Sequence, residues 1–64
     1  MSNLQRIRKE RNLTQGQLAY KTKIPVKTIQ AYEQWSRDIN KASGETLKKI
    51  AEALGCAIDD LLEK

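Results

Sequence analysis

The sequence contains no histidine and no phenylalanine, and it has one cysteine and one proline among its 64 residues. Without histidine, Ser-His-Asp and Cys-His catalysis are excluded, as is every zinc site that needs an imidazole ligand. Cys56 alone can form neither an internal disulfide nor a cysteine-rich zinc site. Most enzyme classes are therefore excluded, and we expect no metal ion and no cofactor.

Long apolar runs are also missing. No stretch approaches the ~20 residues that span a membrane, and the N-terminal residues lack the apolar core of a signal peptide. Hydrophobic residues make up 39% of the chain and charged residues 31%, as in soluble globular domains. So short a chain buries only about 60% of the surface that its unfolded form exposes. We therefore expect one domain with a small core over residues 1–64.

Charge is divided unevenly along the chain. Residues 1–32 contain seven basic side chains and one acidic side chain, a net charge of +6. Residues 33–64 contain five basic and seven acidic side chains, a net charge of −2. Two interpretations remain open from charge alone: a basic surface that binds a polyanion, or a solvated basic helix.

Capping residues and apolar spacing predict three helices in the first half of the chain. Ser2 with Gln5, and Thr14 with Gln17, each fit the capping-box pattern that satisfies free amides at a helix start. The helices are expected over about residues 3–11, 15–22 and 26–34. The second helix ends before Ile24–Pro25, because proline disfavours a helical conformation in the residue before it. The side chains expected to face the core are Leu4, Ile7, Leu18, Ala19, Ile29 and Tyr32.

The second half is predicted to contain an irregular polar segment and two more helices. Residues 35–42 carry Ile39 as their one aliphatic anchor. Ser43 caps a fourth helix that stops at Gly55, a residue that favours the left-handed conformation. Apolar spacing predicts a short fifth helix over residues 58–62. The predicted fold is therefore all-α, a compact bundle of five short helices.

Several motifs occur together in one order. The segment from Gln15 to Tyr32 has the spacing of a helix-turn-helix, two short helices joined by three or four residues, and Ala19 is small enough to let them approach. The chain also contains LTQ at 13–15, QLA at 17–19, TIQAYE at 28–33 and ETLKKIAEALG at 45–55. From Leu4 to Leu62 it resembles the phage repressor/Cro (XRE-type) helix-turn-helix family. The resemblance implies a lambda-repressor-like fold with the motif formed by helices 2 and 3.

The resemblance implies that the third helix enters the major groove of double-stranded DNA. Lysine can donate to guanine, glutamine can pair with adenine, and valine or alanine can contact a thymine methyl group. The alternative is that this face of the helix is simply exposed to solvent. The residues expected to contact bases are Val26, Lys27, Thr28, Gln30 and Ala31.

The resemblance also implies phosphate contacts on both sides of the third helix. Gln15 matches the family's phosphate-binding glutamine at the start of the second helix, and a role in the Thr14 cap is the alternative. Arg8 and Glu33 match a pair that fixes the recognition helix to the first helix. The residues expected to contact phosphates are Gln15, Ser36, Arg37, Asn40 and Lys41.

Three positions depart from the family pattern. Lys23 stands where the turn usually has a left-handed glycine, and Trp35 stands where glycine commonly closes the third helix. Pro25 replaces the usual serine cap. Trp35 could pack on the fourth helix, touch the DNA backbone or mark a partner surface, and we expect packing.

The predicted function is sequence-specific, double-stranded DNA-binding regulation of transcription, as a repressor that acts as a homodimer on operator-like half-sites. The alternative is a protein-interaction module on the same fold, such as an antitoxin-like partner. The expected dimer contact is the C-terminal helix with Ile58, Leu61 and Leu62, unless the monomer core uses these residues. The resemblance implies a bacterial or phage protein in the cytoplasm, associated with the nucleoid and not with a membrane.

Overall fold

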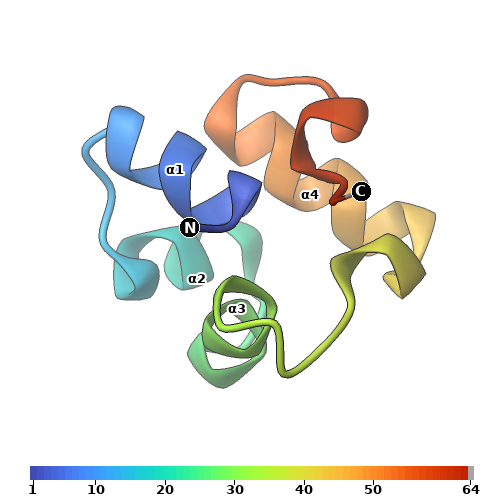
Figure 1. The fold of residues 1–64 in the computed structure, drawn as a ribbon. Coiled ribbons are helices and arrows are strands. Elements are labelled where there is room, and N and C mark those ends of the chain that lie inside the picture. The colour runs from blue at the N-terminus through green and yellow to red at the C-terminus, as the bar shows by residue number, and fades with distance from the viewer. Residues whose placement is uncertain (64) are drawn as a thin grey trace.

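Four α-helices and two single-turn 3-10 helices make up the computed structural model, which describes residues 1–63 (Figure 1). The all-α prediction is confirmed, but the predicted count of five helices is wrong. The α-helices are α1 (Asn3–Glu10), α2 (Gln15–Thr22), α3 (Val26–Glu33) and α4 (Gly44–Leu54), and the 3-10 helices are η1 (Ile39–Lys41) and η2 (Ile58–Leu61).

The predicted fifth helix is the single turn η2. Its hydrogen bonds span three residues, since Asp60 N–H donates to the Ala57 carbonyl at 3.1 Å and Leu62 N–H donates to the Asp59 carbonyl at 3.3 Å. The Asp60 carboxylate also accepts a hydrogen bond from Ala57 N–H at 3.0 Å, which caps the turn. At Leu62 the chain is extended again, with φ −73° and ψ 144°. The apolar spacing therefore marks one buried turn and not an α-helix.

Predicted caps start three of the four α-helices. Thr14 Oγ1 accepts a hydrogen bond from Gln17 N–H at 3.0 Å, and Gln17 Oε1 accepts one from Thr14 N–H at 2.8 Å, which completes the capping box of α2. Ser2 and Ser43 each accept an amide three residues ahead, at the starts of α1 and α4. Helix α3 starts after Pro25 without a side-chain cap. The first and third helices each end one residue before the predicted end, because Arg11 and Gln34 are C-caps.

Within residues 1–63, three residues that are not glycine hold left-handed conformations, and two of them, Lys23 and Trp35, lie at the two ends of α3. Lys23 has φ 60° between α2 and α3, and Trp35 has φ 61° after α3. The expected packing of Trp35 is wrong, because 59% of the residue is exposed. Both residues carry the strain that glycine would avoid.

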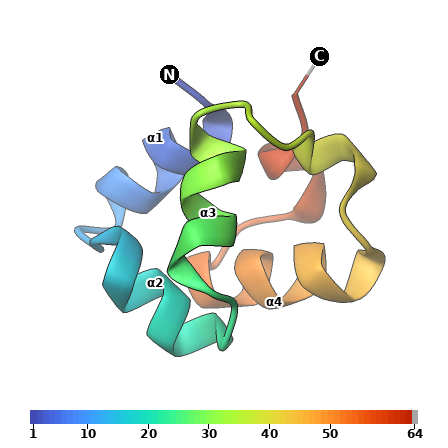
Figure 2. The same ribbon diagram turned by 90° about the horizontal axis from the view of Figure 1, so that it is seen from below.

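The core lies where α3 packs on α1 and α2, while α4 packs on α2 and η2. Figure 2 shows α3 in front of the other elements, with α2 on one side of it and the segment that carries η1 on the other. Of the residues predicted to face the core, Ala19 is only partly buried and the others are buried. The buried apolar residues are Leu4, Ile7, Leu18, Ile24, Ile29, Tyr32, Ile39, Leu47, Ile50, Ala51, Leu54 and Leu61.

Candidate nucleic-acid interface

Helix α3 has one buried face and one exposed face. Ile29, Tyr32 and Glu33 are buried against the rest of the domain. The five residues predicted to contact bases lie on the other side of the helix. Three of them are exposed and two are half-buried: Val26, Lys27 and Gln30 in the first group, and Thr28 and Ala31 in the second.

A buried ion pair fixes the C-terminal end of α3 to α1. Arg8 Nε donates to Glu33 Oε2 at 2.7 Å, and Arg8 Nη2 donates to Glu33 Oε1 at 3.0 Å. The third nitrogen, Arg8 Nη1, donates to the Leu13 carbonyl at 2.6 Å in the turn before α2. Only 8% of the Arg8 side chain and 1% of the Glu33 side chain are exposed. The predicted pair is therefore present, and it joins α1, the turn before α2 and α3.

The same carboxylate orients Gln15. Gln15 Nε2 donates to Glu33 Oε1 at 3.0 Å, whereas the Thr14 cap is completed by Gln17. The alternative role of Gln15 in that cap is therefore wrong. The contact with Glu33 uses one hydrogen of the amide, so the second hydrogen can donate to a phosphate, while the oxygen can accept a hydrogen bond from solvent. Sequence reasoning missed this contact, because it joins residues that only the folded chain brings together.

Thr22 shapes the turn of the helix-turn-helix and is absent from the sequence predictions. It is buried, and its hydroxyl donates to the Leu18 carbonyl at 2.8 Å. The same oxygen accepts a hydrogen bond from Ile24 N–H at 3.3 Å, across the left-handed Lys23. A threonine in the last turn of a predicted helix is a signal that could have identified it, because threonine hydroxyls bond the carbonyl four residues back.

The segment after α3 brings two cations to the start of α4. The Arg37 guanidinium lies 5.5 Å from the centroid of the Tyr32 ring, a cation–π contact. Arg37 and Lys41 are exposed, and with Ser43 and one carboxylate, that of Asp38, they line a hollow of about 430 Å³ beside the first turn of α4. Ser36, also a predicted phosphate contact, is exposed in the same segment. Cations and a helix N-terminus together suit an anion such as a phosphate.

Asn40 differs from its predicted phosphate-binding neighbours. Its Nδ2 donates to the Glu63 carbonyl, and its Oδ1 accepts a hydrogen bond from Glu63 N–H at 2.8 Å. Both ends of the amide are thus bonded to the C-terminal segment. These bonds use the amide oxygen and one of the two amide hydrogens, so only the second hydrogen of Nδ2 remains for a phosphate.

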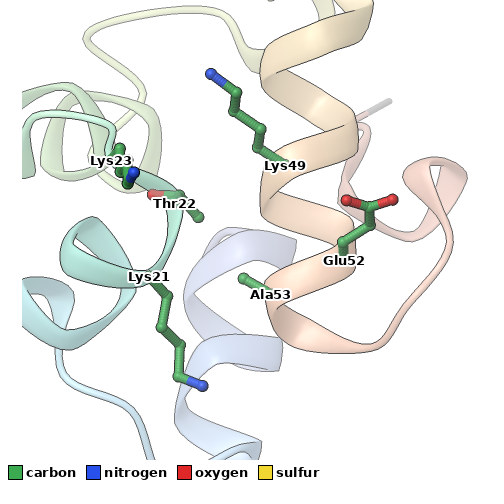
Figure 3. Close-up of a pocket in the computed structure, with 6 residues that line it drawn as sticks. All are labelled: Lys21, Thr22, Lys23, Lys49, Glu52 and Ala53. Carbon is green, nitrogen blue, oxygen red and sulfur yellow. The ribbon is translucent and has the colours of Figure 1, made fainter.

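A second basic surface lies between the end of α2 and α4. A hollow of about 520 Å³ lies there. Figure 3 shows Lys21 and Lys23 on one side of it and Lys49 and Glu52 on the other. Lys49 Nζ also lies 3.3 Å from Glu45 Oε1. Lys23 immediately precedes the Ile24–Pro25 turn into α3. The positive charge of Lys27 on α3 is therefore followed by that of Lys23 on this side of the domain.

The remaining reactive group is the Cys56 thiol. It is half-buried in the turn after α4, and burial, with a smaller contribution from the Asp60 carboxylate, raises the pKa of the thiol above its ordinary value. The thiol is therefore neutral near pH 7 and a poor nucleophile. Within residues 1–63, no group of three or more histidine, cysteine, aspartate or glutamate side chains could hold a metal ion. No helix in this range is long and apolar enough to cross a membrane.

The exposed helix α3 is joined by a tight turn to the supporting helix α2, and polar side chains lie on both sides of α3. This arrangement is that of a helix-turn-helix domain. The helix-turn-helix family model HTH_3 matches residues 4–61. The chain belongs to this XRE-type helix-turn-helix family, whose members are DNA-binding regulators. The resemblance noted in the sequence is thereby confirmed. Neither the curated proteins nor the solved structures gave a match.

Proposed function

We propose that this chain is a sequence-specific transcriptional repressor that reads the major groove of double-stranded DNA with α3. The observation that carries the proposal is the exposed face of α3 between Gln15 on one side and Arg37 and Lys41 on the other. Bases lie inside the groove and phosphates line its edges, so this order of side chains matches the groove in cross-section. A domain that occupies a site overlapping a promoter keeps other proteins off that DNA, which would repress transcription.

The exposed face of α3 offers different chemistry to different base pairs. Lys27 donates to guanine O6 and N7, and Gln30 pairs with adenine N6 and N7. Val26, of which 44% is exposed, supplies an apolar contact for a thymine methyl group. Thr28 and Ala31 are half-buried and small, so they allow α3 to approach the bases closely. With eight residues α3 is about 12 Å long, comparable to the ~12 Å width of the major groove.

Phosphates bind on the two flanks. Gln15 meets one strand at the N-terminus of α2, where the helix dipole favours an anion and the bond to Glu33 orients the amide. Arg37 and Lys41 meet the other strand at the start of α4, with Ser36 as a neutral donor beside them. Asn40 is left out of this set because its amide is bonded to Glu63.

We further propose that the protein binds as a homodimer to inverted half-sites whose centres lie about 34 Å apart. The dimer contact expected from the sequence included Leu61, but Leu61 is 0% exposed and belongs to the core of the monomer. Ile58 and Leu62 are partly buried against that core. Leu61 is therefore part of the monomer core, as the alternative expected, and is not available for a dimer contact.

Selection of bound duplexes from a random pool tests both parts of the proposal. We expect an enriched inverted repeat, and we expect a chain with Lys27→Ala and Gln30→Ala to lose the enrichment while it still binds duplexes weakly. A single enriched half-site would support the reading of DNA and contradict the dimer. No enrichment by the unsubstituted chain would contradict sequence-specific binding.

A protein-interaction module is the second candidate function, and an exposed aromatic residue favours it. Tyr20 on α2 is 87% exposed and lines a hollow of about 470 Å³ with Leu13 and Gly16. Such a surface suits an apolar side chain of a partner protein. Association that salt does not weaken, and that Tyr20→Ser abolishes, would favour this candidate, because DNA binding weakens steeply with salt.

A further inference from the structure

The C-terminal segment is hydrogen-bonded to the loop that carries the proposed phosphate ligands. Asn40 in η1 donates through Nδ2 to the Glu63 carbonyl and accepts through Oδ1 from Glu63 N–H at 2.8 Å. A side-chain amide carries the same donor and acceptor as a peptide unit, so Asn40 pairs with the backbone of Glu63 as a neighbouring strand would.

The same segment is bonded to α1 on its other side. Asn3 Nδ2 donates to the Leu62 carbonyl at 2.8 Å, and Asn3 N–H donates to Glu63 Oε2 at 2.6 Å. This second bond places a carboxylate at the N-terminus of α1, where the helix dipole favours a negative charge. Residues 62–63 thus connect the first turn of α1 to η1. We call Asn3, Asn40 and residues 62–63 the clasp.

The two ends of the loop are held by different contacts. Next to α3, Ser36 N–H and Arg37 N–H both donate to the Ala31 carbonyl, at 2.9 and 3.2 Å. Of residues 35–42, only Ile39 is buried, Ala42 is half-buried and the other six are exposed. Asn40 is separated from Arg37 by two residues and is adjacent to Lys41 in the sequence. Arg37 is also held by α3, through the Ala31 carbonyl and the Tyr32 ring, whereas the position of Lys41 depends on Ile39 in the core and on the bonds between Asn40 and Glu63.

From this arrangement we infer that Asn40 is a positioning residue, and that the clasp holds η1, and with it Lys41 and the far end of the loop that carries Arg37, where the cations meet DNA phosphates. The inference rests on the proposed function and assigns Asn40 a different role from its neighbours. Asn40 touches the C-terminal segment, and the two cations touch the DNA.

Salt dependence distinguishes positioning from direct contact. Asn40→Ala removes no charge, so a direct phosphate contact by Asn40 contributes nothing to counterion release. If the variant misplaces one or both cations, the magnitude of the slope of log affinity against log salt falls by about 0.9 for each phosphate that is no longer neutralised. We expect such a fall, and we expect preferred and random duplexes to be weakened by a similar factor of about ten, as when one or two hydrogen bonds are removed.

A pair of variants at Glu63 tests the clasp from its other side. Glu63→Pro removes the N–H that donates to Asn40, and Leu62 already has the extended conformation that proline favours in the residue before it. Glu63→Ala is the matched control, because it loses the same charge and keeps the N–H. We expect Glu63→Pro to reduce the salt slope as Asn40→Ala does, and we expect Glu63→Ala to reduce it less. The double variant Asn40→Ala with Glu63→Pro should bind no more weakly than either single variant.

Several outcomes would overturn the inference. If Asn40→Ala weakens binding while Glu63→Pro does not, or if their effects add, Asn40 is itself a phosphate ligand. If neither variant changes binding or amide exchange at residues 37–41, the clasp does not hold the loop. Thermal melting of each variant checks that the core is intact, and we expect small shifts because the pair between Asn40 and Glu63 is exposed. If the unsubstituted chain binds no duplex, the proposed function fails and the inference fails with it, a result distinct from those above.

Discussion

The two flanks of α3 are held by different means. On the α2 side, Gln15 is bonded to Glu33, whose carboxylate is paired with Arg8, and both charged side chains are buried. On the other side, Ile39 is the one buried side chain of residues 35–42, and the bonds between Asn40 and Glu63 are exposed. We call the α2 side the buried flank, because the ion pair that holds it is buried, and the other side the exposed flank, because its hydrogen bonds are exposed.

The difference indicates which part of the interface is fixed before DNA arrives. Separating a buried ion pair leaves an unpaired charge in the interior, whereas opening an exposed hydrogen bond costs only about 1 kcal/mol. We therefore expect the buried flank to set the angle of α3 against the domain. The exposed flank can open locally and follow the phosphate backbone.

Breaking the buried flank should have the largest effect. Glu33→Ala leaves Arg8 buried without its carboxylate and removes the acceptor that orients Gln15. We expect the free energy of unfolding to fall by about 3–5 kcal/mol, measured by denaturant titration. The variant should lose stability before it loses sequence-specific DNA binding.

The matched control replaces both charges. Arg8→Met with Glu33→Leu leaves no unpaired charge, so the double variant should be less destabilised than Glu33→Ala. A double-mutant cycle between Arg8 and Glu33 should then give a coupling energy well above zero. Losses that simply add would show that the two side chains do not interact.

The crossing of α2 and α3 supports the same flank. Ala19 is partly buried against the core, and a leucine there overpacks the contact predicted between these helices. We expect Ala19→Leu to cost about 1–3 kcal/mol, measured as a fall in Tm. Ala53→Leu is the control, since Ala53 lines an open hollow that can accept the larger side chain. Equal melting temperatures for Ala19→Leu and the unsubstituted chain would place Ala19 away from the crossing.

Local signals in the sequence predicted the buried flank well. The cap at Thr14 fixes the start of α2 through bonds within three residues, and a pattern of that length is visible in the sequence. The pair between Arg8 and Glu33 followed from the family resemblance, since no local rule joins residues 25 apart. The resemblance also located the helix-turn-helix, and the match of residues 4–61 confirms it.

The exposed flank was predicted less well, because its contacts depend on where distant segments of the chain meet. Asn40 has a side-chain amide that can donate to a phosphate. Only the fold shows that this amide is bonded to Glu63, 23 residues away. One contact of the buried flank was missed for the same reason: Gln15 was assigned to phosphate, and its bond to Glu33 needed the angle between α2 and α3. The turn η2 was taken for a helix because apolar spacing does not distinguish one 3-10 turn from the start of an α-helix.

The exposed flank and the centre of α3 should respond differently to alanine. Lys27→Ala should cost about 1–3 kcal/mol on the preferred duplex and much less on random DNA, because only the matching base pair presents the right acceptors. Arg37→Ala or Lys41→Ala should weaken all duplexes similarly and reduce the magnitude of the salt slope by about 0.9. Titrations of preferred and random duplexes at several salt concentrations measure both quantities.

Each of these assignments has an outcome that reverses it. If Lys27→Ala weakens preferred and random duplexes equally, Lys27 is a phosphate ligand and the bases are read elsewhere on α3. If Arg37→Ala affects the preferred duplex alone, the exposed flank reads sequence. If none of the three variants changes DNA binding, the protein-interaction module becomes the better proposal.

The smallest expected effects concern the two left-handed residues at the ends of α3. Lys23→Gly relieves φ 60° and should raise the free energy of unfolding by up to about 1 kcal/mol, less the extra chain entropy that glycine gives the unfolded state. Trp35→Gly relieves φ 61° in the same way, but it also removes an indole that is 59% exposed. Strain in an exposed aromatic residue beside Arg37 suggests a functional contact. We therefore expect Trp35→Gly to raise Tm and weaken DNA binding. We expect Lys23→Gly to raise Tm and to weaken binding to all duplexes only through the loss of one positive charge. If Trp35→Gly binds DNA as well as the unsubstituted chain does, Trp35 is an ordinary surface residue.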